Sequence, residues 1–371
     1  MSKPAHLVLV GGGHAHALVL ASFAAHPEPR LRISLVSPEP YATYSGMVPD
    51  VVAGAQALRA AQIDLPALAR RSAAAFVAAR VRHIDLARRA LELNDGSHLA
   101  YDLLSCDVGA EPARTTPVDA GAPLIAVRPI ASAVARLEAA LGTPPPQSGR
   151  RIVVVGAGAA GTEIACALAV RLRHEPLASI VVCDAAGRPL AERGQRTQAQ
   201  VERAFAELGI RFAGGAAVER VTRAGVELAN ADEIPADLIV WATGAGGATL
   251  FRDSGLPVDR NGCLLVGTDL CCQTHPEIFA AGDCATLTAW PDLPKAGVYA
   301  VRQAPVLAAN LRAAVSGEPR RAFRPQARFL ALLNTGDGRA ILSYGSLAWR
   351  SGWALRLKRR IDRRFVAQLN P

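Results

Sequence analysis

The chain has 371 residues, of which half are hydrophobic and 20% are charged, and its formal net charge is +9. This length is typical of two or three domains, and the composition excludes an intrinsically disordered chain. Seven scattered cysteines do not resemble a secreted disulfide framework, so we expect reduced thiols in a cytoplasmic protein.

The first predicted unit is a strand, a glycine turn and a helix within the sequence VLVGGGHAHALVL. Gly11 and Gly13 take the two positions where a small backbone lets a pyrophosphate approach. His14 and Ala15 follow at the helix start, where free N–H groups and the helix dipole favour a phosphate. His16 stands where a third glycine usually permits close packing, so we expect it to tilt the helix or fill a gap. A metal site is not expected, because residues two apart do not share a helix face.

The strand that follows this helix ends in LVSPEP. Ser37 stands where an acid often holds a ribose, and Glu39 comes two residues later. Either side chain could reach a ribose hydroxyl. The alternative is that both residues simply belong to a proline-rich turn.

A second unit of the same kind occurs in RIVVVGAGAAGTEIACALAVRL. Gly156, Gly158 and Gly161 form an intact G-x-G-x-x-G motif, in the strand-to-helix context that makes it credible. The next strand ends at Asp184, where a carboxylate can hydrogen-bond a ribose 2′-hydroxyl and repel a 2′-phosphate. This favours NADH over NADPH, with Arg188 as the main argument against that preference.

Each glycine turn is followed later by a strand-like run that ends in glycine. Gly109 ends YDLLSCDVG, Gly244 ends ADLIVWATG, and a predicted hairpin precedes each run. We therefore predict an α/β fold with two Rossmann-like, three-layer dinucleotide-binding domains, the second inserted in the first, and a small C-terminal region. The Pro- and Gly-rich stretch 142–149 is the expected linker. The predicted boundaries are 1–115 and 246–316 for the first domain, 116–149 for a connecting segment, 150–245 for the second domain and 317–371 for the C-terminal region.

The two turns, ATG at 242–244 and FAAGDCA at 279–285 together resemble the two-dinucleotide-binding-domain flavoproteins of the pyridine nucleotide-disulfide oxidoreductase superfamily. The resemblance covers about residues 5–315. It implies FAD on the first turn and a nicotinamide cofactor on the second. In that family the aspartate of the GD motif holds the FAD ribityl chain, which implies this role for Asp283 with Gly282.

A narrower resemblance rests on GGGHAH, YSGMVP, PKAGVYAVRQAPVL, LLNTGDGRA and RIDRRF. These stretches are similar to the NADH dehydrogenase-like flavoproteins found alone or fused to selenide, water dikinase. The chain has no kinase part, so selenophosphate synthesis is not implied. The expected activity is that of an FAD-dependent NADH oxidoreductase of type II NADH dehydrogenase type, passing hydride from NADH to FAD and on to an unidentified quinone or small molecule.

The same resemblance implies a set of residues around the reacting rings. Tyr44 and Ser45 are expected near the flavin, and the helix that begins near Ala296 is expected to point its N-terminus there. Lys295 would add a positive charge, unless it is a solvated lysine at a helix start. Glu163 matches an acidic position near the nicotinamide, unless it is an exposed acid that stabilises its helix.

Four other functions agree with the sequence less well. A disulfide reductase needs a cysteine pair soon after the first helix, and residues 14–60 contain none. A sulfide:quinone-type reductase stays an alternative, although the adjacent Cys271 and Cys272 are poorly placed for a disulfide. Asp184 argues against an NADPH-dependent N-hydroxylating monooxygenase. A non-catalytic flavin sensor or scaffold that docks on selenophosphate synthetase is the alternative from another class.

The C-terminal stretch SGWALRLKRRIDRRFVAQ predicts a basic amphipathic helix. From Glu318 onward there are 12 Lys and Arg against 3 acids, which accounts for the whole net charge. The helix could bind an anionic membrane surface, pack on the body with a solvated basic face, or dock a partner. The expected location is the cytoplasm, with peripheral binding to the cytoplasmic membrane as an option; nucleic acid is not an expected partner. The apolar side is expected to consist of Trp353, Leu357, Ile361 and Phe365, and the basic side mostly of Arg356, Arg359, Arg360 and Arg363.

Overall fold

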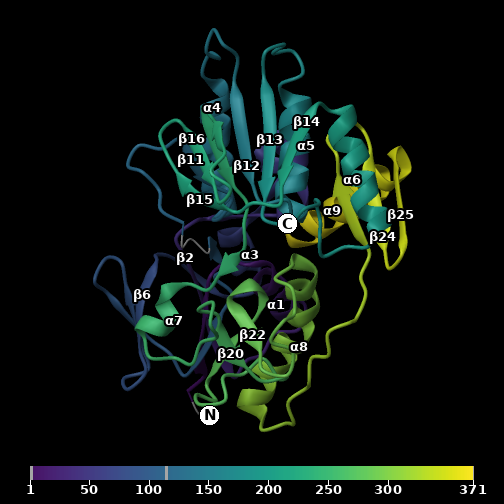
Figure 1. Cartoon of the computed structure of the whole chain (residues 1–371). Helices are drawn as coiled ribbons and strands as arrows, with labels where there is room; N and C mark the ends of the chain where they lie inside the picture. The colour runs from purple at the N-terminus through teal and green to yellow at the C-terminus, as the bar shows by residue number, and fades with distance from the viewer. Residues whose placement is uncertain (1–2, 113–115, 371) are drawn as a thin grey trace.

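The computed structural model describes residues 3–112 and 116–370. Two parallel sheets of five strands form the centres of two lobes, the first in the lower part and the second in the upper part of Figure 1. Their strands are short apolar runs, as expected where both faces of a parallel sheet are buried. The first sheet has the order β21-β9-β1-β2-β5 and consists of β1 (Ala5–Val10), β2 (Leu31–Ser37), β5 (Ala75–Ala78), β9 (Leu103–Cys106) and β21 (Ile278–Ala280).

The second sheet repeats this arrangement with strands from the middle of the chain. Its order is β11-β18-β12-β13-β14, and every pairing within it is parallel. The glycine turn of each unit thus follows the central strand of its sheet, with the next strand beside it. The strands are β11 (Leu124–Ala126), β12 (Arg151–Val155), β13 (Ser179–Asp184), β14 (Ile210–Gly214) and β18 (Leu238–Trp241).

The predicted insertion of one domain into the other is confirmed by the pairing of β21. This strand lies beside β9, with Ile278 opposite Leu104, although the whole second sheet separates the two in sequence. The first lobe is therefore built from two separate stretches of chain. The domain boundaries proposed from the sequence stay predictions, and the boundary at residue 115 lies outside the described residues.

Both lobes also carry the predicted hairpins, each extended to three antiparallel strands. In the first lobe the turn contains Gly96, whose φ of +81° is the left-handed conformation that glycine adopts readily. The two small sheets occupy the same place in their units, directly before β9 and β18. They are β6 (Val81–Asp85), β7 (Ala90–Leu93) and β8 (His98–Ala100), and β15 (Val218–Val221), β16 (Gly225–Leu228) and β17 (Glu233–Pro235).

Helices cover both sheets, and in each lobe one of them begins at the glycine turn. In the first lobe α1 packs against α8, and in the second α5 packs against β12 and β13. α8 ends at Gly317, whose left-handed conformation closes the helix. The main helices are α1 (His14–Ala25), α3 (Leu65–Arg71), α4 (Ile130–Gly142), α5 (Ala159–Arg171), α6 (Gln195–Glu207) and α8 (Gly297–Ser316).

Short elements join these layers. Three of them matter for the site: η1 (Ser45–Met47) and α2 (Val48–Val52) after the first lobe's second strand, and η3 (Gly282–Cys284) after β21. In the predicted linker at 142–149, Gly142 is the last residue of α4, and residues 143–149 contain no helix or strand. The others are β3 (Tyr41–Thr43), η2 (Leu58–Ala61), β4 (Gln62–Asp64), β10 (Glu111–Pro112), β19 (Ala245–Gly246), α7 (Thr249–Asp253), β20 (Leu264–Val266) and β22 (Ala285–Leu287).

The C-terminal region forms a three-stranded antiparallel sheet followed by one long helix, drawn in yellow beside α6 in Figure 1. Its elements are β23 (Ala331–Asn334), β24 (Ala340–Tyr344), β25 (Leu347–Ser351) and α9 (Gly352–Leu369). Ser351 caps α9 as a cap residue should, because its hydroxyl accepts a hydrogen bond from the Ala354 N–H. None of the helices in the described ranges combines the length and apolar character that crossing a bilayer requires.

The apolar side of α9 expected from the sequence is mostly not the side that packs on the body. Phe365 is buried, but Trp353 and Ile361 are exposed, and the basic Lys358 is buried. The period of four residues correctly indicates a helix, but tertiary packing selects a neighbouring face for burial. The buried face consists of Ala354, Leu355, Lys358, Asp362, Phe365, Val366 and Leu369.

Candidate functional site

A cavity of about 1540 Å³ opens at the carboxyl ends of the second sheet's strands. This edge of an open parallel sheet is where dinucleotides bind in such folds. Gly156 and Gly158 line the cavity after β12, Asp184 lines it at the end of β13, and Gly244 after β18. The structure therefore brings these four predicted residues together around one space.

Gly161 serves a different purpose from Gly158, although both belong to the same motif. A Cβ on Gly161 would overlap the carbonyl oxygen of Gly156, so the first turn of α5 lies directly on the strand end. A Cβ on Gly158 would meet nothing within 4 Å. The face of Gly158 is thus open to a ligand, whereas Gly161 allows helix and strand to pack.

Asp184 is held in place by the backbone around the second turn. One carboxylate oxygen accepts a hydrogen bond from Ala157 N at 2.6 Å, and the other accepts one from Ala186 N at 2.8 Å. Arg188, which was the main argument for NADPH, instead forms an ion pair with Glu202 at 2.8 Å on α6. It is not among the residues that line the cavity.

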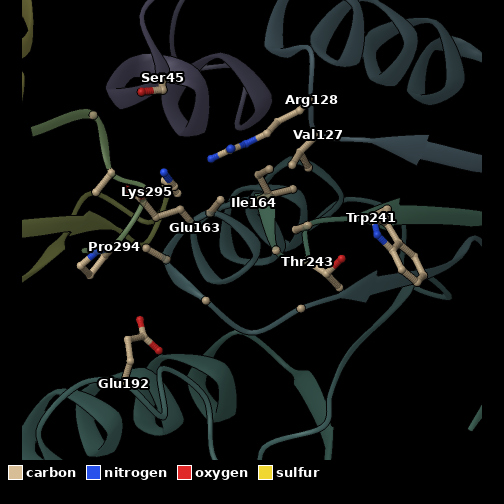
Figure 2. Close-up of a pocket in the computed structure, with 18 of the residues that line it drawn as sticks. Ser45, Val127, Arg128, Glu163, Ile164, Glu192, Trp241, Thr243, Pro294 and Lys295 are labelled. Atoms are coloured by element: carbon tan, nitrogen blue, oxygen red, sulfur yellow. The ribbon is translucent and has the colours of Figure 1, made fainter. Parts of the chain in front are cut away.

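Four side chains that line the cavity each carry a buried polar atom with no hydrogen-bond partner within the described part of the chain. These atoms are the indole nitrogen of Trp241, the hydroxyl of Thr243, the Nη1 of Arg128 and the Nε2 of Gln326. Figure 2 shows Trp241, Thr243 and Arg128 around the space, with Arg128 on the side of Ser45 and Lys295. The atoms themselves are buried within the wall, so it is other atoms of these side chains that border the cavity.

The other end of the cavity is built by the first lobe. Ser45, Lys295, Ala296 and Gly297 line it, so the N-terminus of α8 faces the space as expected. The partly buried Lys295 ammonium donates hydrogen bonds to the Ala285 carbonyl at 2.5 Å and the Thr286 hydroxyl at 2.8 Å. The lysine is therefore positioned beside the GD segment, at the edge of the cavity.

Glu163 lies inside this end of the cavity wall, and the exposed position considered from the sequence is wrong. Its carboxylate accepts a hydrogen bond from Asn334 N at 2.7 Å, and burial raises its pKa to about 7 against the lowering effect of Lys358. Glu163 can therefore hold or release a proton near neutral pH.

α9 contributes a buried cation to the same neighbourhood, which the sequence interpretation missed. Lys358 donates hydrogen bonds to the Gly46 carbonyl at 2.7 Å and to Asp362 at 3.1 Å. Next to it, Arg359 pairs with Asp50 at 2.8 Å, and Asp50 accepts a further bond from Asn334. The C-terminal helix is thus tied by charge to the segment that begins at Ser45. Only the separation of Lys358 and Asp362 by one helical turn could have signalled this pair.

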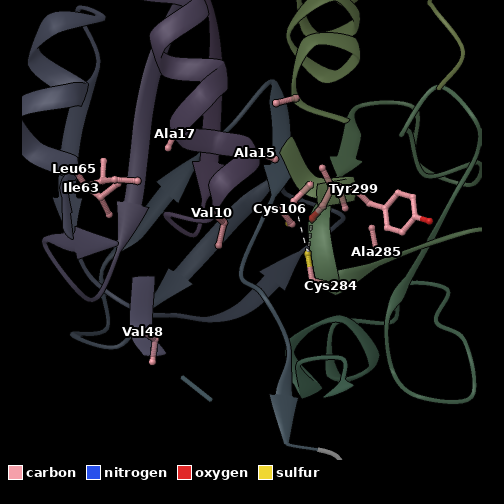
Figure 3. Packing of buried hydrophobic residues seen from close by; sticks show 14 of the residues in the cluster. Val10, Ala15, Ala17, Val48, Ile63, Leu65, Cys106, Cys284, Ala285 and Tyr299 are labelled. Carbon is pink, nitrogen blue, oxygen red and sulfur yellow. Dashed lines mark hydrogen bonds between the residues drawn. The ribbon is translucent and has the colours of Figure 1, made fainter. Parts of the chain in front are cut away.

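The first glycine turn has the expected backbone but different surroundings. Gly11 has a φ of +93°, and a Cβ there would overlap the backbone of Asp107. The neighbouring spaces are filled by side chains, because a Cβ on Gly12 would overlap Leu65 and one on Gly13 would overlap the Asp107 carboxyl. Figure 3 shows Leu65, Ala15 and Cys106 in the apolar core around this turn.

His16 fills a gap, which was one of the two expected outcomes. The ring is fully buried, with Nδ1 2.7 Å from the Gly11 carbonyl oxygen and Nε2 2.8 Å from the Ser105 hydroxyl. Burial lowers its pKa to about 4, so the ring is neutral at physiological pH. In the first unit the imidazole therefore fills a space between the helix and the strand end. In the second unit this space is absent, because Gly161 packs directly on the strand end.

The remaining predicted residues of the first lobe surround the start of α1. His14 and Phe365 contact the ring of Tyr44, with centroid distances of 5.3 and 4.5 Å. Ser37 is buried and donates a hydrogen bond to the Glu39 carbonyl at 3.0 Å, as in the proline-rich turn considered above. The roles of these residues in cofactor binding stay predictions.

The GD segment joins both lobes through an ion pair that was also missed. Arg128, from the end of β11, lies 3.1 Å from the Asp283 carboxylate. Gly282 N donates to the Gln303 side chain at 2.7 Å, which fixes the segment on α8. Gly109 has a positive φ, and a Cβ added to it would meet nothing within 4 Å, so this glycine borders open space. The backbone of the first turn and these groups fit FAD, with Asp107 as the exception.

The cysteines have the character of structural thiols. All seven lie within the described residues, are buried and are free. Burial raises the pKa of Cys106 to about 12 and that of Cys271 to about 11, which disfavours the reactive thiolate. Within the ranges described, no group of three or more His, Cys, Asp and Glu side chains is arranged to hold a metal ion.

Similar proteins agree with this architecture. The ferredoxin–NAD(+) reductase component of the biphenyl dioxygenase system of Paraburkholderia xenovorans is 31% identical over 271 residues, 70% of this chain and 62% of that protein. An NADH dehydrogenase-like protein of Mycobacterium tuberculosis is 28% identical over 238 residues, 62% of this chain and 59% of that protein. The matches thus span about three fifths of the length of these relatives.

A solved structure matches over almost the whole fold. NDH2 from Plasmodium falciparum in complex with NADH superposes with a TM-score of 0.82, covering 97% of each chain at 15% identity. Residues 5–304 match the family described as pyridine nucleotide-disulphide oxidoreductase. This match covers most of the chain, including both glycine turns and the GD segment. The chain belongs to the pyridine nucleotide-disulphide oxidoreductase family.

Proposed function

We propose that this protein is an FAD-dependent NADH oxidoreductase of the NADH dehydrogenase-like type. FAD, when bound, accepts a hydride from NADH and passes the electrons to an acceptor. The protein would hold FAD at the first glycine turn and GD segment, and NADH at the second turn. The acceptor would be a quinone, a small molecule or a protein carrier.

The shape of the cavity is the observation that carries this proposal. It begins at Asp184 and the second glycine turn and extends to Ser45, Lys295 and the start of α8 in the other lobe. A dinucleotide lying along it would therefore have its ribose end at Asp184 and its reactive end at the junction of the lobes. The side chains of Trp241, Thr243 and Arg128 line the same space.

The residues at the junction can each support hydride transfer without forming a bond to the substrate. The N-terminus of α8 presents free N–H groups, and Lys295 adds a positive charge, so negative charge is stabilised there. Glu163 can hold or release a proton at its carboxylate near neutral pH. Ser45 and the Gly46 backbone border the space and are held through Lys358.

NADH is the preferred donor in this proposal. Asp184 lines the cavity, and its negative charge would repel the 2′-phosphate of NADPH. Arg188 is paired with Glu202 and so is not available to that phosphate. A sulfide:quinone-type activity is less well supported, because the buried thiols disfavour the thiolate that sulfide chemistry uses.

Anaerobic titration of the purified protein tests the proposal. We expect a yellow protein whose flavin absorbance bleaches with NADH much more readily than with NADPH. Reoxidation by a quinone, by oxygen and by selenium compounds would then identify the acceptor class. Protein without flavin, or flavin that NADH does not bleach, would contradict the proposal, and bleaching without turnover on any acceptor would favour a redox sensor or scaffold.

Asp184→Ser provides a matched variant for the donor preference. Removing the carboxylate should narrow the preference for NADH over NADPH by about tenfold, since one charge repulsion is lost. Glu202→Gln tests the contribution of Arg188 separately, because it releases Arg188 without touching Asp184. If Asp184→Ser leaves the ratio unchanged, the carboxylate does not select the cofactor.

A second proposal concerns where the protein works: we infer that the outer face of α9 binds an anionic lipid surface. Trp353 and Ile361 are 53% and 46% exposed on it, and Leu357 lies between them. The flanking basic residues are suited to anionic headgroups. The exposed arginines of this helix are Arg356, Arg360, Arg363 and Arg364.

Co-sedimentation with liposomes tests this second proposal. The protein should pellet with phosphatidylglycerol-containing vesicles and much less with pure phosphatidylcholine, and Trp353→Ser with Ile361→Ser should abolish pelleting. Leu177→Ser is the control, because Leu177 is an exposed apolar residue outside α9. Equal soluble fractions with and without anionic vesicles would exclude the membrane and leave a protein partner for this face.

A further inference from the structure

The inference concerns Asp107 and rests on the proposed binding of FAD at the first glycine turn. Asp107 follows β9 and is 3% exposed. Its carboxylate accepts a hydrogen bond from the His16 N–H at 3.0 Å, within the first turn of α1. A Cβ on Gly13 would overlap this carboxyl, and a Cβ on Gly282 would lie 2.6 Å from it. The acid therefore sits between the two glycine segments expected to hold FAD.

The second unit shows what the same position looks like without an acid. Asp107 N donates to the Val10 carbonyl at 2.9 Å, and Ala242 N donates to the Val155 carbonyl at 2.7 Å. A Cβ on Gly11 would meet the Asp107 carbonyl, and one on Gly156 would meet the Ala242 carbonyl. Asp107 and Ala242 are thus equivalent in the two folds.

The side chain at this position decides whether the neighbouring glycine faces open space. Gly158, in the unit with Ala242, has nothing within 4 Å of its missing Cβ, whereas the same face of Gly13 is taken by the Asp107 carboxyl. That face is where a dinucleotide pyrophosphate approaches the turn. Asp107 therefore puts an anionic group at a helix N-terminus that is expected to receive the anionic phosphates of FAD.

The groups packed around Asp107 do not supply a cation to offset this conflict. His16 is neutral at physiological pH, and the Cys106 and Cys284 thiols are buried and protonated. His14, at the start of α1, is also disfavoured by burial as a cation. Asp283, on η3, is an acid whose own ion pair is with Arg128.

We propose that FAD binding is coupled to protonation of Asp107. The carboxylate takes one proton from solvent as the pyrophosphate reaches the face of Gly13, and the neutral carboxyl then serves as a hydrogen-bond donor at this site. Burial, together with the nearby negative charge of Asp283, raises the pKa of Asp107 to about 7, against the two backbone N–H bonds that it accepts. The proton is therefore readily available within the physiological range.

The pH dependence of FAD affinity follows directly. Below pH 7 the carboxyl is already neutral, and the dissociation constant should be constant. Above pH 7 binding must take up a proton, so the dissociation constant should rise about tenfold per pH unit. Dilution of the holoprotein between pH 6 and 9, followed by the fluorescence of released FAD, measures this constant.

Two variants separate Asp107 from other causes. Asp107→Asn keeps the shape of the side chain without its charge, and Asp107→Ala reproduces Ala242 of the second unit. Both should bind FAD with the same affinity from pH 6 to 9, and at pH 9 more tightly than the native protein by about a hundredfold. A native slope that persists in both variants would overturn the inference.

Calorimetry gives a readout that does not depend on affinity or activity. FAD added to flavin-depleted protein at pH 8, in two buffers of different ionisation heat, should show uptake of about one proton per FAD, and none in Asp107→Asn. No proton uptake in the native protein would also overturn the inference. Absence of FAD binding by the native protein at every pH would instead contradict the proposed function itself.

Discussion

The two glycine turns of this chain share one backbone plan but differ in what surrounds them. At the second turn, the third glycine packs directly on the strand end and the face of Gly158 is open to a cavity. At the first turn, His16 bonds to the Gly11 carbonyl, and the face of Gly13 is covered by Asp107. A glycine motif therefore specifies the path of the chain, while neighbouring side chains decide how a ligand can approach it.

The two turns also differ in which residues provide packing and which leave a face open to a ligand. At the second turn the two tasks fall on different glycines, Gly161 for packing and Gly158 for the open face. At the first turn packing depends on a buried imidazole, and the open face depends on a carboxyl that must be neutral. The first turn is thus linked to pH through two of its packing partners, His16 and Asp107.

The largest expected effect comes from α9, which touches both units through Phe365 near His14 and Lys358 near Glu163. Lys358→Met should lower the free energy of unfolding by about 3 to 5 kcal/mol, because Asp362 and Glu163 lose their buried cation. Urea denaturation measures this loss. Arg356→Met on the exposed face is the control, and a loss no larger than that of the control would mean that α9 does not hold the two units together.

The next largest effect is the pH dependence of stability that His16 gives to the first turn. The pKa of His16 is about 4 in the fold and 6.5 in its absence, so the unfolded chain binds more protons between these values. Stability should therefore fall as pH drops from 6.5 to 4, by roughly 3 kcal/mol from this residue. Unfolding midpoints of the native protein and His16→Gln at pH 7, 5.5 and 4.5 measure it.

His16→Gln should lose markedly less stability over this range than the native protein, although it starts from a lower value. His6, which also has a lowered pKa through burial, remains in both proteins and cancels in the difference. Parallel curves for the two proteins would show that His16 does not make the first turn sensitive to acid.

The smallest effects distinguish the two glycines of the second turn. Gly161→Ala should cost about 1 to 3 kcal/mol of stability, because its Cβ would overlap the Gly156 carbonyl. Gly158→Ala should change stability by less than about 0.5 kcal/mol, because its Cβ meets open space. NADH affinity should nevertheless fall about tenfold in Gly158→Ala, as measured by fluorescence titration. Equal stability losses in the two variants would remove the distinction between packing and binding positions.

Much of the architecture could be predicted from local patterns. Apolar runs that enter glycine turns, and hairpins with Asp95 and Gly96 at the turn, depend on residues close in sequence. The insertion could be predicted because the GD segment, which completes the first unit, comes after the second unit in the sequence. The position of Asp184 followed from its distance to the second glycine turn, whereas that of the α8 N-terminus followed from the resemblance to the flavoprotein family.

The parts of the site that were missed depend on contacts between distant residues. Asp107 differs visibly from its counterpart, as CDVG against WATG, but its meaning depends on the face of Gly13 that it covers. Arg128 acquires a role only because Asp283 lies beside it. The burial of Lys358 could not be predicted from the helical pattern, since Trp353 and Ile361 are more apolar and yet remain exposed.

The pairing of β21 with β9 has a consequence for how the protein is made. During synthesis, the first sheet keeps an unpaired edge at β9 until the chain has emerged through Ala280. All strands of the second sheet have emerged well before that point, so this sheet can fold before the first one is complete. Unpaired strand edges attract other chains, so slow elongation or truncation between the two strands should favour aggregation of the nascent protein.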